Sequence, residues 1–449
     1  MRRWNLSHYA ISSCVAAALL AGCGVLPLSL SKGQDDTQPP IGAPGALLQT
    51  SALATRTDRT HYKVVYSFGA APDGKNPQAS LIGVGGTLYG TTYFGGASPS
   101  CGSSADGGTV FSITPSGTEK VLHTFTGNGT DGCNPQAALI DVGGTLYGTT
   151  IGGGMYGCGI YSGYNYDPCG TVFSITPGGK EKVLHYFGGY DSGDGGDPSA
   201  PLIDVKGTLY GTTWLGGHHF CPQSGYPFRC GTVFTVTLAG VEKVLYDFHR
   251  RTDANYPRAG LIHVGRTFYG TTYGDRNSCP GKGCGAVFRL TTGGKEKTLH
   301  SFGSGSDGRF PQAGLIEING MLYGTTDGGG SYPCNGFYQG CGTVFSITIN
   351  GTEKVLHSFG SGSDGSTPQA SLIDVNGTLY GTTSSGGTYG DGTVFSISTT
   401  GKEKVLHSFG SGSDGSTPEA SLIDVKGSLY GTTSRGGKHG DGTVFELKQ

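Results

Sequence analysis

The sequence predicts an all-β fold: a seven-bladed β-propeller of four-stranded antiparallel blades, closed by an N-terminal strand that completes the last blade. The first observation behind this prediction is a tetrapeptide, Tyr-Gly-Thr-Thr, that recurs at intervals of 50 to 63 residues. A period near 50 is typical of radial repeats such as propellers. The tetrapeptide starts at seven positions: Tyr89, Tyr147, Tyr210, Tyr269, Tyr323, Tyr380 and Tyr430.

The second observation is the composition. Of 449 residues, 85 are Gly, and charged residues make up only 14%, well below the ~25% of an ordinary domain. Gly without a collagen period, together with 24 Tyr and 20 Phe, indicates many short strands joined by tight turns. A net charge of −2 argues against a nucleic-acid partner, which needs a basic surface. We also expect a monomer with no cofactor.

The N-terminal segment has the features of an export signal, so residues 1–22 are excluded from the fold. Two arginines precede a short apolar stretch that ends in Leu-Ala-Gly followed by Cys23. This tetrapeptide resembles the lipobox of bacterial lipoprotein precursors, which implies cleavage before Cys23 and lipidation of its thiol. Gly24 in place of Asp favours the outer membrane or cell surface. The alternative is an ordinary signal peptide. Under both interpretations we expect residues 23–60 to form a flexible tether.

The sixth copy shows the repeating unit most clearly. Residues 371–375 and 378–383 form two strands joined by Asn376-Gly377, a strong hairpin signal because both turn residues need positive φ. A Gly-rich loop leads to a third strand at 393–397, and a second tight turn leads to a fourth at 404–409. Four short strands in a meander describe one propeller blade.

The phase of the repeat predicts how the ring closes. The first repeated phrase, residues 63–68, is an additional fourth strand, whereas the last copy ends after its third. Pairing the two removes both open sheet edges; the alternative, a linear solenoid, needs polar capping repeats at its ends. The propeller then spans 61–449, with blades at approximately 78–125, 136–187, 199–248, 257–302, 311–359, 368–409, and 418–449 with 63–68.

Loop lengths and cysteines predict one functional face. The second-to-third and the interblade connections are long, and in a meander both emerge on the same side. Apart from Cys14 and Cys23, ten cysteines remain and are expected to form disulfides in an exported protein, with zinc as the alternative that irregular spacing disfavours. The expected pairs are Cys158–Cys169, Cys221–Cys230, Cys279–Cys284, Cys334–Cys341 and, as the remaining pair across two loops, Cys101–Cys133.

Two recurrent polar positions invite a metal interpretation. One position in the fourth strand holds His123, His185, His300, His357 and His407, but Tyr66 and Tyr246 replace His in two copies, which favours packing. An Asp also recurs in each interblade loop, where a turn is the simpler explanation. No metal is therefore predicted, except that a calcium site at Asp191, Asp194 and Asp197 stays open.

The repeated phrases resemble a known family. Leu-Tyr-Gly-Thr-Thr, Gly-Gly, Gly-Thr-Val-Phe and Lys-Val-Leu-His-Ser-Phe, recurring from Lys63 to Gln449, are similar to the GloVer (Gloeo/Verruco) tandem repeat of bacterial surface proteins. The departures are small: Gly285-Ala286-Val287-Phe288 in blade four, and Phe268 for Leu. The resemblance implies an extracytoplasmic protein and transfers no catalytic residue.

The loops that differ between copies supply the candidate ligand-binding residues. Aromatic side chains give large, stiff contact surfaces, and Arg suits carboxylate or phosphate, although loop packing and a solvated basic patch explain them as well. His249 and Arg258 accompany the basic cluster. The candidates are Tyr161, Tyr164, Trp214, His218, His219, Phe220, Tyr226, Arg250, Arg251, Arg276 and Tyr338.

Two functional hypotheses follow. The first is a surface-anchored binding or interaction scaffold that recognises a glycan, peptide or envelope polymer through the long loops. The second is a propeller enzyme acting on polysaccharide, a lyase or glycosidase, for which Asp275 and Asp327 are candidate acids whose partners the sequence does not identify. No nucleophile elbow, His-Glu-x-x-His or phosphate-binding Gly loop occurs, so the binding hypothesis is favoured.

Overall fold

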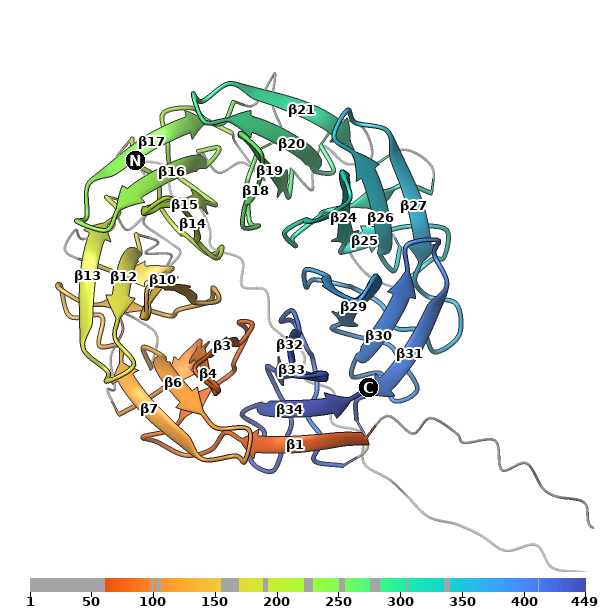
Figure 1. Cartoon of the computed structure of the whole chain (residues 1–449), viewed down its shortest axis with the longest axis horizontal. Helices are drawn as coiled ribbons and strands as arrows, with labels where there is room; N and C mark the ends of the chain where they lie inside the picture. Colours follow the sequence, from red (N-terminus) through yellow and green to blue (C-terminus); the bar gives the residue numbers. More distant parts are fainter. Residues whose placement is uncertain are drawn as a thin grey trace, which may run out of the picture. The chain divides into compact units, whose positions relative to one another are not determined.

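The computed structural model describes most of the region after residue 60 as a ring of small antiparallel sheets (Figure 1). The described residues are 61–97, 101, 106–154, 169–188, 193–221, 229–249, 255–274, 283–303, 306–334, 340–410 and 412–449. The chain divides into two units, Met1–Thr57 and Asp58–Gln449, and only the second contains described residues. Within them there is no helix, and hence none that could cross a membrane.

Seven four-stranded sheets form the blades of a β-propeller, as predicted. Blade 1 consists of β3 Ile82–Val84, β4 Thr87–Thr92, β6 Thr109–Ile113 and β7 Glu119–Thr124, and blade 2 of β9 Ile140–Val142, β10 Thr145–Thr150, β12 Thr171–Ile175 and β13 Glu181–Tyr186. Blade 3 consists of β14 Ile203–Val205, β15 Thr208–Thr213, β16 Thr232–Thr237 and β17 Glu242–Asp247, and blade 4 of β18 Ile262–Val264, β19 Thr267–Thr272, β20 Ala286–Thr291 and β21 Glu296–Ser301. Blade 5 consists of β23 Ile316–Ile318, β24 Met321–Thr326, β26 Thr343–Thr348 and β27 Glu353–Ser358, and blade 6 of β28 Ile373–Val375, β29 Thr378–Thr383, β30 Thr393–Ser398 and β31 Glu403–Ser408. Blade 7 consists of β32 Ile423–Val425, β33 Ser428–Thr433, β34 Thr443–Lys448 and β1 His61–Ser67.

The N-terminal strand closes the ring. β1 pairs antiparallel with β34, from His61 opposite Lys448 to Ser67 opposite Thr443, with one register shift between Val64 and Tyr66. Figure 1 shows the two strands side by side although they come from opposite ends of the propeller sequence. The predicted closure by an N-terminal strand is confirmed, and β1 covers the edge of β34 that would otherwise be open.

The Tyr-Gly-Thr-Thr phrase recurs because three of its positions have fixed structural roles. A Cβ added to the Gly of any copy would lie 2.5–2.7 Å from the Cζ of the Phe in the neighbouring third strand, so only Gly fits. The second Thr hydrogen bonds to the Thr that opens the third strand in six blades, with Oγ1–Oγ1 distances of 2.8–2.9 Å. In blade 4, Ala286 replaces that Thr, and Thr272 Oγ1 is buried without a hydrogen-bond partner among the described residues.

The core lies between blades. The Phe that follows each fourth strand packs edge-to-face on the Phe in the third strand of the next blade, with ring centroids 5.0–5.3 Å apart. The pair across the closure, Phe68 with Phe111, has the same geometry as the internal pairs, at 5.1 Å and 72°. Each such pair adds about 0.5–1.5 kcal/mol beyond the burial of its area. The same Phe–Phe pair therefore stabilises every contact between neighbouring blades.

The two sets of long loops share a face, as the sequence predicts. Three two-stranded sheets each pair an interblade loop with the second-to-third loop of the following blade: β2 Gly74–Lys75 with β5 Phe94–Gly95, β8 Gly132–Cys133 with β11 Gly152–Gly153, and β22 Gly308–Arg309 with β25 Gly328–Gly329. We call this side the long-loop face.

Disulfides reinforce the long-loop face. Cys101–Cys133, Cys221–Cys230 and Cys334–Cys341 are bonded, which are three of the expected pairs. Cys169 and Cys284 are also disulfide-bonded, whereas their expected partners Cys158 and Cys279 lie outside the described residues. Cys101–Cys133 joins the second-to-third loop of blade 1 to the interblade loop that follows it, because both loops are on this face.

Candidate functional site

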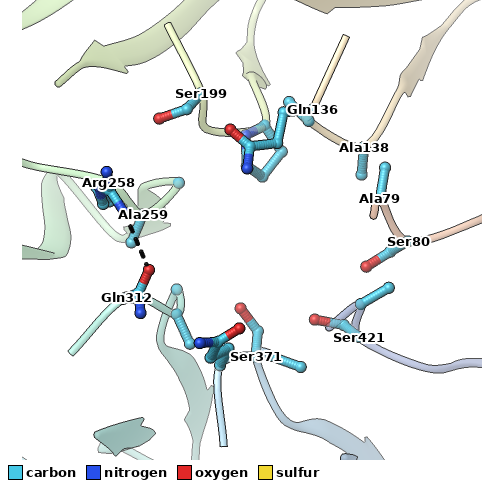
Figure 2. Close-up of a pocket in the computed structure, with 18 of the residues that line it drawn as sticks. Ala79, Ser80, Gln136, Ala138, Ser199, Arg258, Ala259, Gln312, Ser371 and Ser421 are labelled. Atoms are coloured by element: carbon cyan, nitrogen blue, oxygen red, sulfur yellow. Dashed lines mark hydrogen bonds between the residues drawn. The ribbon is translucent and has the colours of Figure 1, made fainter. Parts of the chain in front are cut away.

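A pocket of 540 Å³ lies on the axis of the ring and is lined by residues from all seven blades. Its wall is the segment Pro-Xaa-Ala-Xaa-Leu, which enters the first strand of each blade directly after the interblade loop. Since the interblade loops and the residues that follow Tyr-Gly-Thr-Thr belong to the long-loop face, the pocket lies at that end of the axis. Figure 2 shows the lining side chains arranged around an open centre.

Hydrogen bonds between blades hold each wall segment in place. In every blade the first Thr of Tyr-Gly-Thr-Thr donates to the carbonyl of the Ala in the next Pro-Xaa-Ala segment, at 2.9–3.4 Å. The bond from Thr432 to Ala79 crosses the closure between the last blade and the first. The repeated tetrapeptide therefore positions the pocket without lining it.

The backbone that leads into the wall adopts a left-handed conformation in every blade. The residue before each Pro has φ between 54° and 62°, although none is Gly: Asn76, Asn134, Asp197, Tyr256, Phe310, Thr367 and Thr417. This region is unfavourable for bulky and β-branched residues, at about 1–3 kcal/mol each. Backbone hydrogen bonds fix it: Thr367, for example, donates to the carbonyl of Cys341 in the preceding blade and accepts from Ser384 in its own. Such strain is concentrated at binding and catalytic sites, which supports a functional role for this pocket.

The side chains that face the pocket differ between copies at two positions. The position after Pro carries Gln78, Gln136, Ser199, Arg258, Gln312, Gln369 and Glu419. The position after Tyr-Gly-Thr-Thr carries Tyr93, Ile151, Trp214, Tyr273, Asp327, Ser384 and Ser434, of which Tyr93, Ile151 and Trp214 line the pocket. At the second position, blades 1 to 3 thus supply an apolar, mostly aromatic part of the lining, whereas Tyr273 and Asp327 of blades 4 and 5 contact lining side chains.

Arg258 connects the aromatic part of the lining to its amide side chains. Its guanidinium carbon lies 4.0 Å from the ring centroid of Trp214 and 5.2 Å from that of Tyr273, and its Nη1 donates to Gln312 Oε1 at 3.3 Å (Figure 2). Gln312 and Gln369 in turn donate to the two carboxylate oxygens of Asp327 at 2.8 and 3.2 Å. This network fixes the cation and the amide groups before any ligand arrives.

The pocket also holds two carboxyls that protonate more readily than usual. Burial raises the pKa of Asp197 to about 6, although Arg258 opposes the shift. Burial likewise raises the pKa of Glu419, with the charge of Asp327 adding to the shift and Ser434 and Arg435 opposing it. Perturbed acids in a cavity are typical of binding and catalytic sites.

Two polar atoms of the wall have no hydrogen-bond partner among the described residues. They are Trp214 Nε1, a donor, and Ser199 Oγ, both buried. Leaving a buried polar atom unpaired costs about 1–3 kcal/mol, so a ligand that supplies an acceptor for the indole N–H recovers that energy. Both atoms come from blade 3, on the aromatic side of the pocket.

A second polar cluster lies on the long-loop face at blade 3. Asp247 Oδ2 is 3.1 Å from His218 Nδ1 and 3.9 Å from His219 Nε2, and the His219 ring packs on His249 at 3.7 Å. Phe220 is 56% exposed and carries Arg229 over its ring at 4.6 Å. These side chains cover the surface beside the pocket rather than lining it.

The structure separates the predicted ligand-binding residues into three groups. Trp214 lines the pocket, whereas His218, His219 and Phe220 lie on the neighbouring surface. The remaining candidates, Tyr161, Tyr164, Tyr226, Arg250, Arg251, Arg276 and Tyr338, lie outside the described residues, as do Asp191 and Asp275. Of the open calcium site, Asp194 instead contacts His185 at 3.3 Å and Asp197 lines the pocket.

Most of the pocket wall was missed by the sequence analysis. The signal was present in the position after Pro, which varies inside an otherwise constant phrase and holds four Gln, one Arg, one Glu and one Ser. The predicted ligand-binding residues instead lie in the long loops. Arg258 was assigned to a basic surface cluster, but it faces the central pocket.

Each recurrent His of the fourth strand pairs with the Asp of the interblade loop that follows it. His123, His185, His300, His357 and His407 each place Nε2 3.0–3.5 Å from a carboxylate oxygen of the interblade Asp. Tyr66 makes the equivalent bond to Asp73 at 2.9 Å. The same Asp residues accept backbone N–H groups of their own loops, as Asp131 does from Thr126 and Gly132.

The fold and pocket define a class: a closed seven-bladed propeller built from one repeat, with a polar pocket on its axis. Within this class the chain belongs to the Gloeobacter/Verrucomicrobia repeat family, whose model matches residues 160–337 and 334–449. A search of curated proteins gave no significant match.

Among solved structures the similarities are distant. A putative 6-phosphogluconolactonase from Bacteroides uniformis is 12% identical with a TM-score of 0.41, covering 73% of this chain and 85% of its own. A puromycin hydrolase is 16% identical with a TM-score of 0.47, covering 79% and 50%. A gluconolactonase from Xanthomonas campestris is 13% identical with a TM-score of 0.41, covering 89% and 92%. None of these similarities bears on function.

Proposed function

We propose that this protein is a binding scaffold of the bacterial cell envelope, and that its axial pocket holds a sugar unit of a glycan. The observation that carries the proposal is the pocket wall, where amide side chains surround an aromatic side. Amides both donate and accept hydrogen bonds, as sugar hydroxyls do, and aromatic rings offer a flat apolar surface to the C–H face of a sugar.

The proposed location follows from the disulfides and the leader. Disulfides persist in oxidising compartments, which agrees with an exported protein. We propose that Cys23 carries a lipid that anchors a monomeric propeller to the outer membrane or cell surface, with residues 23–60 as the tether. Globomycin, which blocks lipoprotein signal cleavage, and Cys23→Ser should both leave the chain unprocessed by mass spectrometry.

Binding is tested by screening the purified protein against a glycan and peptidoglycan array, then measuring the affinity of any retained ligand. Trp214→Phe removes the unpartnered N–H but keeps an aromatic ring, and we expect about tenfold weaker binding from the loss of one buried hydrogen bond. Gln136→Ala removes an amide that donates to Gln78 at 3.2 Å and should also weaken binding.

Phe220→Ala is the matched control, because Phe220 is an aromatic residue of the same face that lies outside the pocket. We expect its affinity to equal that of the unchanged protein. If Phe220→Ala abolishes binding while both pocket variants bind normally, the ligand is held by the outer loops and the axial site is wrong. Retention of no arrayed glycan would refute glycan binding.

One observation favours a second candidate, a glycosidase or lyase. Asp197 and Glu419 are pocket carboxyls with raised pKa values, and an acid of this kind can donate a proton to a leaving group near neutral pH. The same array incubations would reveal released oligosaccharide. Turnover that disappears in Asp197→Asn or Glu419→Gln would replace the binding scaffold with an enzyme.

A further inference from the structure

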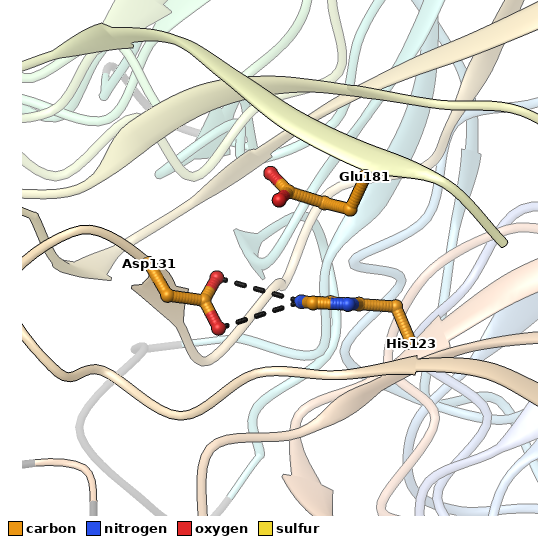
Figure 3. A group of neighbouring side chains, drawn as sticks. All are labelled: His123, Asp131 and Glu181. Atoms are coloured by element: carbon orange, nitrogen blue, oxygen red, sulfur yellow. Dashed lines mark hydrogen bonds and ion pairs between the residues drawn. The ribbon is translucent and has the colours of Figure 1, made fainter.

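At interfaces between blades, a Glu that is distant in the sequence lies near a His–Asp pair of the preceding blade, and at two such interfaces in the described part of the chain the three side chains are close enough to share a metal ion. His123 at the end of β7 and Asp131 in the following loop belong to blade 1, and Glu181 opens β13 of blade 2 (Figure 3). One ligand atom from each lies within 4.8 Å of the other two. His300, Asp307 and Glu353 form the same group between blades 4 and 5.

The distances within these triads match those between neighbouring ligands of one metal ion. His Nε2 is 3.4 Å from the Asp oxygen in the first triad and 3.2 Å in the second. Two ligands at 2.0–2.1 Å from a tetrahedral zinc ion are roughly 3.3 Å apart. The nearest Glu oxygen in each triad lies within 4.8 Å of both the His and the Asp ligand atoms.

The Asp of each triad is already oriented as metal-bound carboxylates usually are, by hydrogen bonds from outside the site. Asp131 accepts from the backbone N–H groups of Thr126 and Gly132 at 2.9 and 2.8 Å. Asp307 accepts from those of Gly303 and Gly308 at 3.2 and 2.8 Å. The His side chains are 21% and 22% exposed, so an ion and its waters can reach both triads from solvent.

The Glu supplies a second observation. Oε1 of Glu181 and of Glu353 is buried and has no hydrogen-bond partner among the described residues, as is also the case for the equivalent Glu119, Glu242 and Glu403. In the described part of the chain, only at Glu181 and Glu353 does a His–Asp pair lie within the distances of a metal site. Each carboxyl also faces the Asp of the same triad across the interface. An unpaired carboxylate oxygen beside a second carboxylate is unfavourable, and a bound cation removes both penalties.

We propose that the triads His123–Asp131–Glu181 and His300–Asp307–Glu353 each bind a divalent transition-metal ion, for which zinc is the best match. One imidazole nitrogen and two carboxylate oxygens suit zinc, and water completes the tetrahedron. Because each triad joins two blades, the ion links neighbours that otherwise share only packing and hydrogen bonds. The recurrent His alone indicated packing; the Glu from the next blade supplies the additional ligand.

The repeat contains its own matched control at the interface between blades 6 and 7. There the position equivalent to Glu181 is Tyr62, whose ring stacks on His407 at 3.8 Å. His407 still contacts Asp414 at 3.1 Å, so this interface keeps the His–Asp pair and lacks the third ligand.

The test measures zinc bound to the full-length chain by equilibrium dialysis and elemental mass spectrometry at pH 7.5. Glu181→Gln and Glu353→Gln keep the size of the side chain and remove its charge. We expect each variant to bind about one zinc equivalent fewer than the unchanged protein, and the double variant two fewer. Zinc should also raise the melting temperature of the unchanged protein more than that of the double variant.

Two further readings decide the outcome. Without zinc, the melting temperature of each variant should stay close to that of the unchanged chain. Such a result would show that the loss of zinc binding does not come from unfolding. His407→Gln should bind as much zinc as the unchanged protein. Equal stoichiometry in the double variant, or loss of an equivalent in His407→Gln, would overturn the triads as metal sites, as would the absence of any bound zinc.

Discussion

The closure by β1 leads to a quantitative prediction about Phe68. Its side chain is fully buried and packs edge-to-face on Phe111 of blade 1. Phe359 occupies the equivalent position inside the ring, against Phe395 at the same 5.1 Å. Truncating a buried Phe to Ala costs about 3–5 kcal/mol. If the N-terminal strand is an integral part of the ring, Phe68→Ala and Phe359→Ala should cost the same.

The expected shift is measurable by calorimetry. For the unit Asp58–Gln449, an unfolding entropy of about 2.1 cal/mol/K per residue amounts to ~0.8 kcal/mol/K, so each kcal/mol lowers the melting temperature by about 1.2 °C. Both variants should therefore melt about 4–6 °C below the unchanged protein. A melting temperature for Phe68→Ala within about 1 °C of the unchanged protein, with Phe359→Ala shifted as expected, would show that β1 is not needed for closure.

Three other predictions concern the repeated framework. Ala286→Thr should raise stability by about 0.5–1.5 kcal/mol in urea unfolding, because it gives the unpaired Thr272 Oγ1 the partner found in the other blades; no gain would contradict this pairing. Gly381→Ala should cost about 1–3 kcal/mol, since its Cβ would lie 2.7 Å from Phe395 Cζ, and an unchanged midpoint would be inconsistent with that contact. Burial raises the pKa of Glu403 from 4.5 to about 7, so the protonated group favours the folded state: its contribution is complete below about pH 4.5 and is lost as pH rises through 7. Glu403→Gln should reduce the fall in melting temperature between pH 5 and 8, and an identical pH profile would refute the shift.

Some residues in and around the pocket could be predicted by comparing the repeat copies, and others could not. Trp214 was found because it stands out in a variable loop, and Asp327 because it is an acid near the axis. Gln312 was missed, since a single Gln inside a constant phrase is unremarkable until Arg258 and Asp327 are seen to bind it. Hydrogen bonds between residues tens of positions apart in the chain leave no local pattern.

The interblade triads illustrate the same limit. Each His has its Asp a few residues away, so the pair is visible as a repeat, but Glu181 lies in another copy. Its position beside His123 depends on the angle and stagger between two blades. The spacing of the repeat along the chain contains neither quantity.

The sequence by itself determined the architecture of this protein. The repeated phrases specify strands, turns and blade number, because each depends on neighbours within one copy: Gly where Phe crosses the strand, and Asn-Gly where φ is positive. The unpaired strand at residues 63–68 also determined the closure. Only the tertiary structure decided which variable residues meet, since the pocket and the triads are formed across copies, where ring geometry sets every distance.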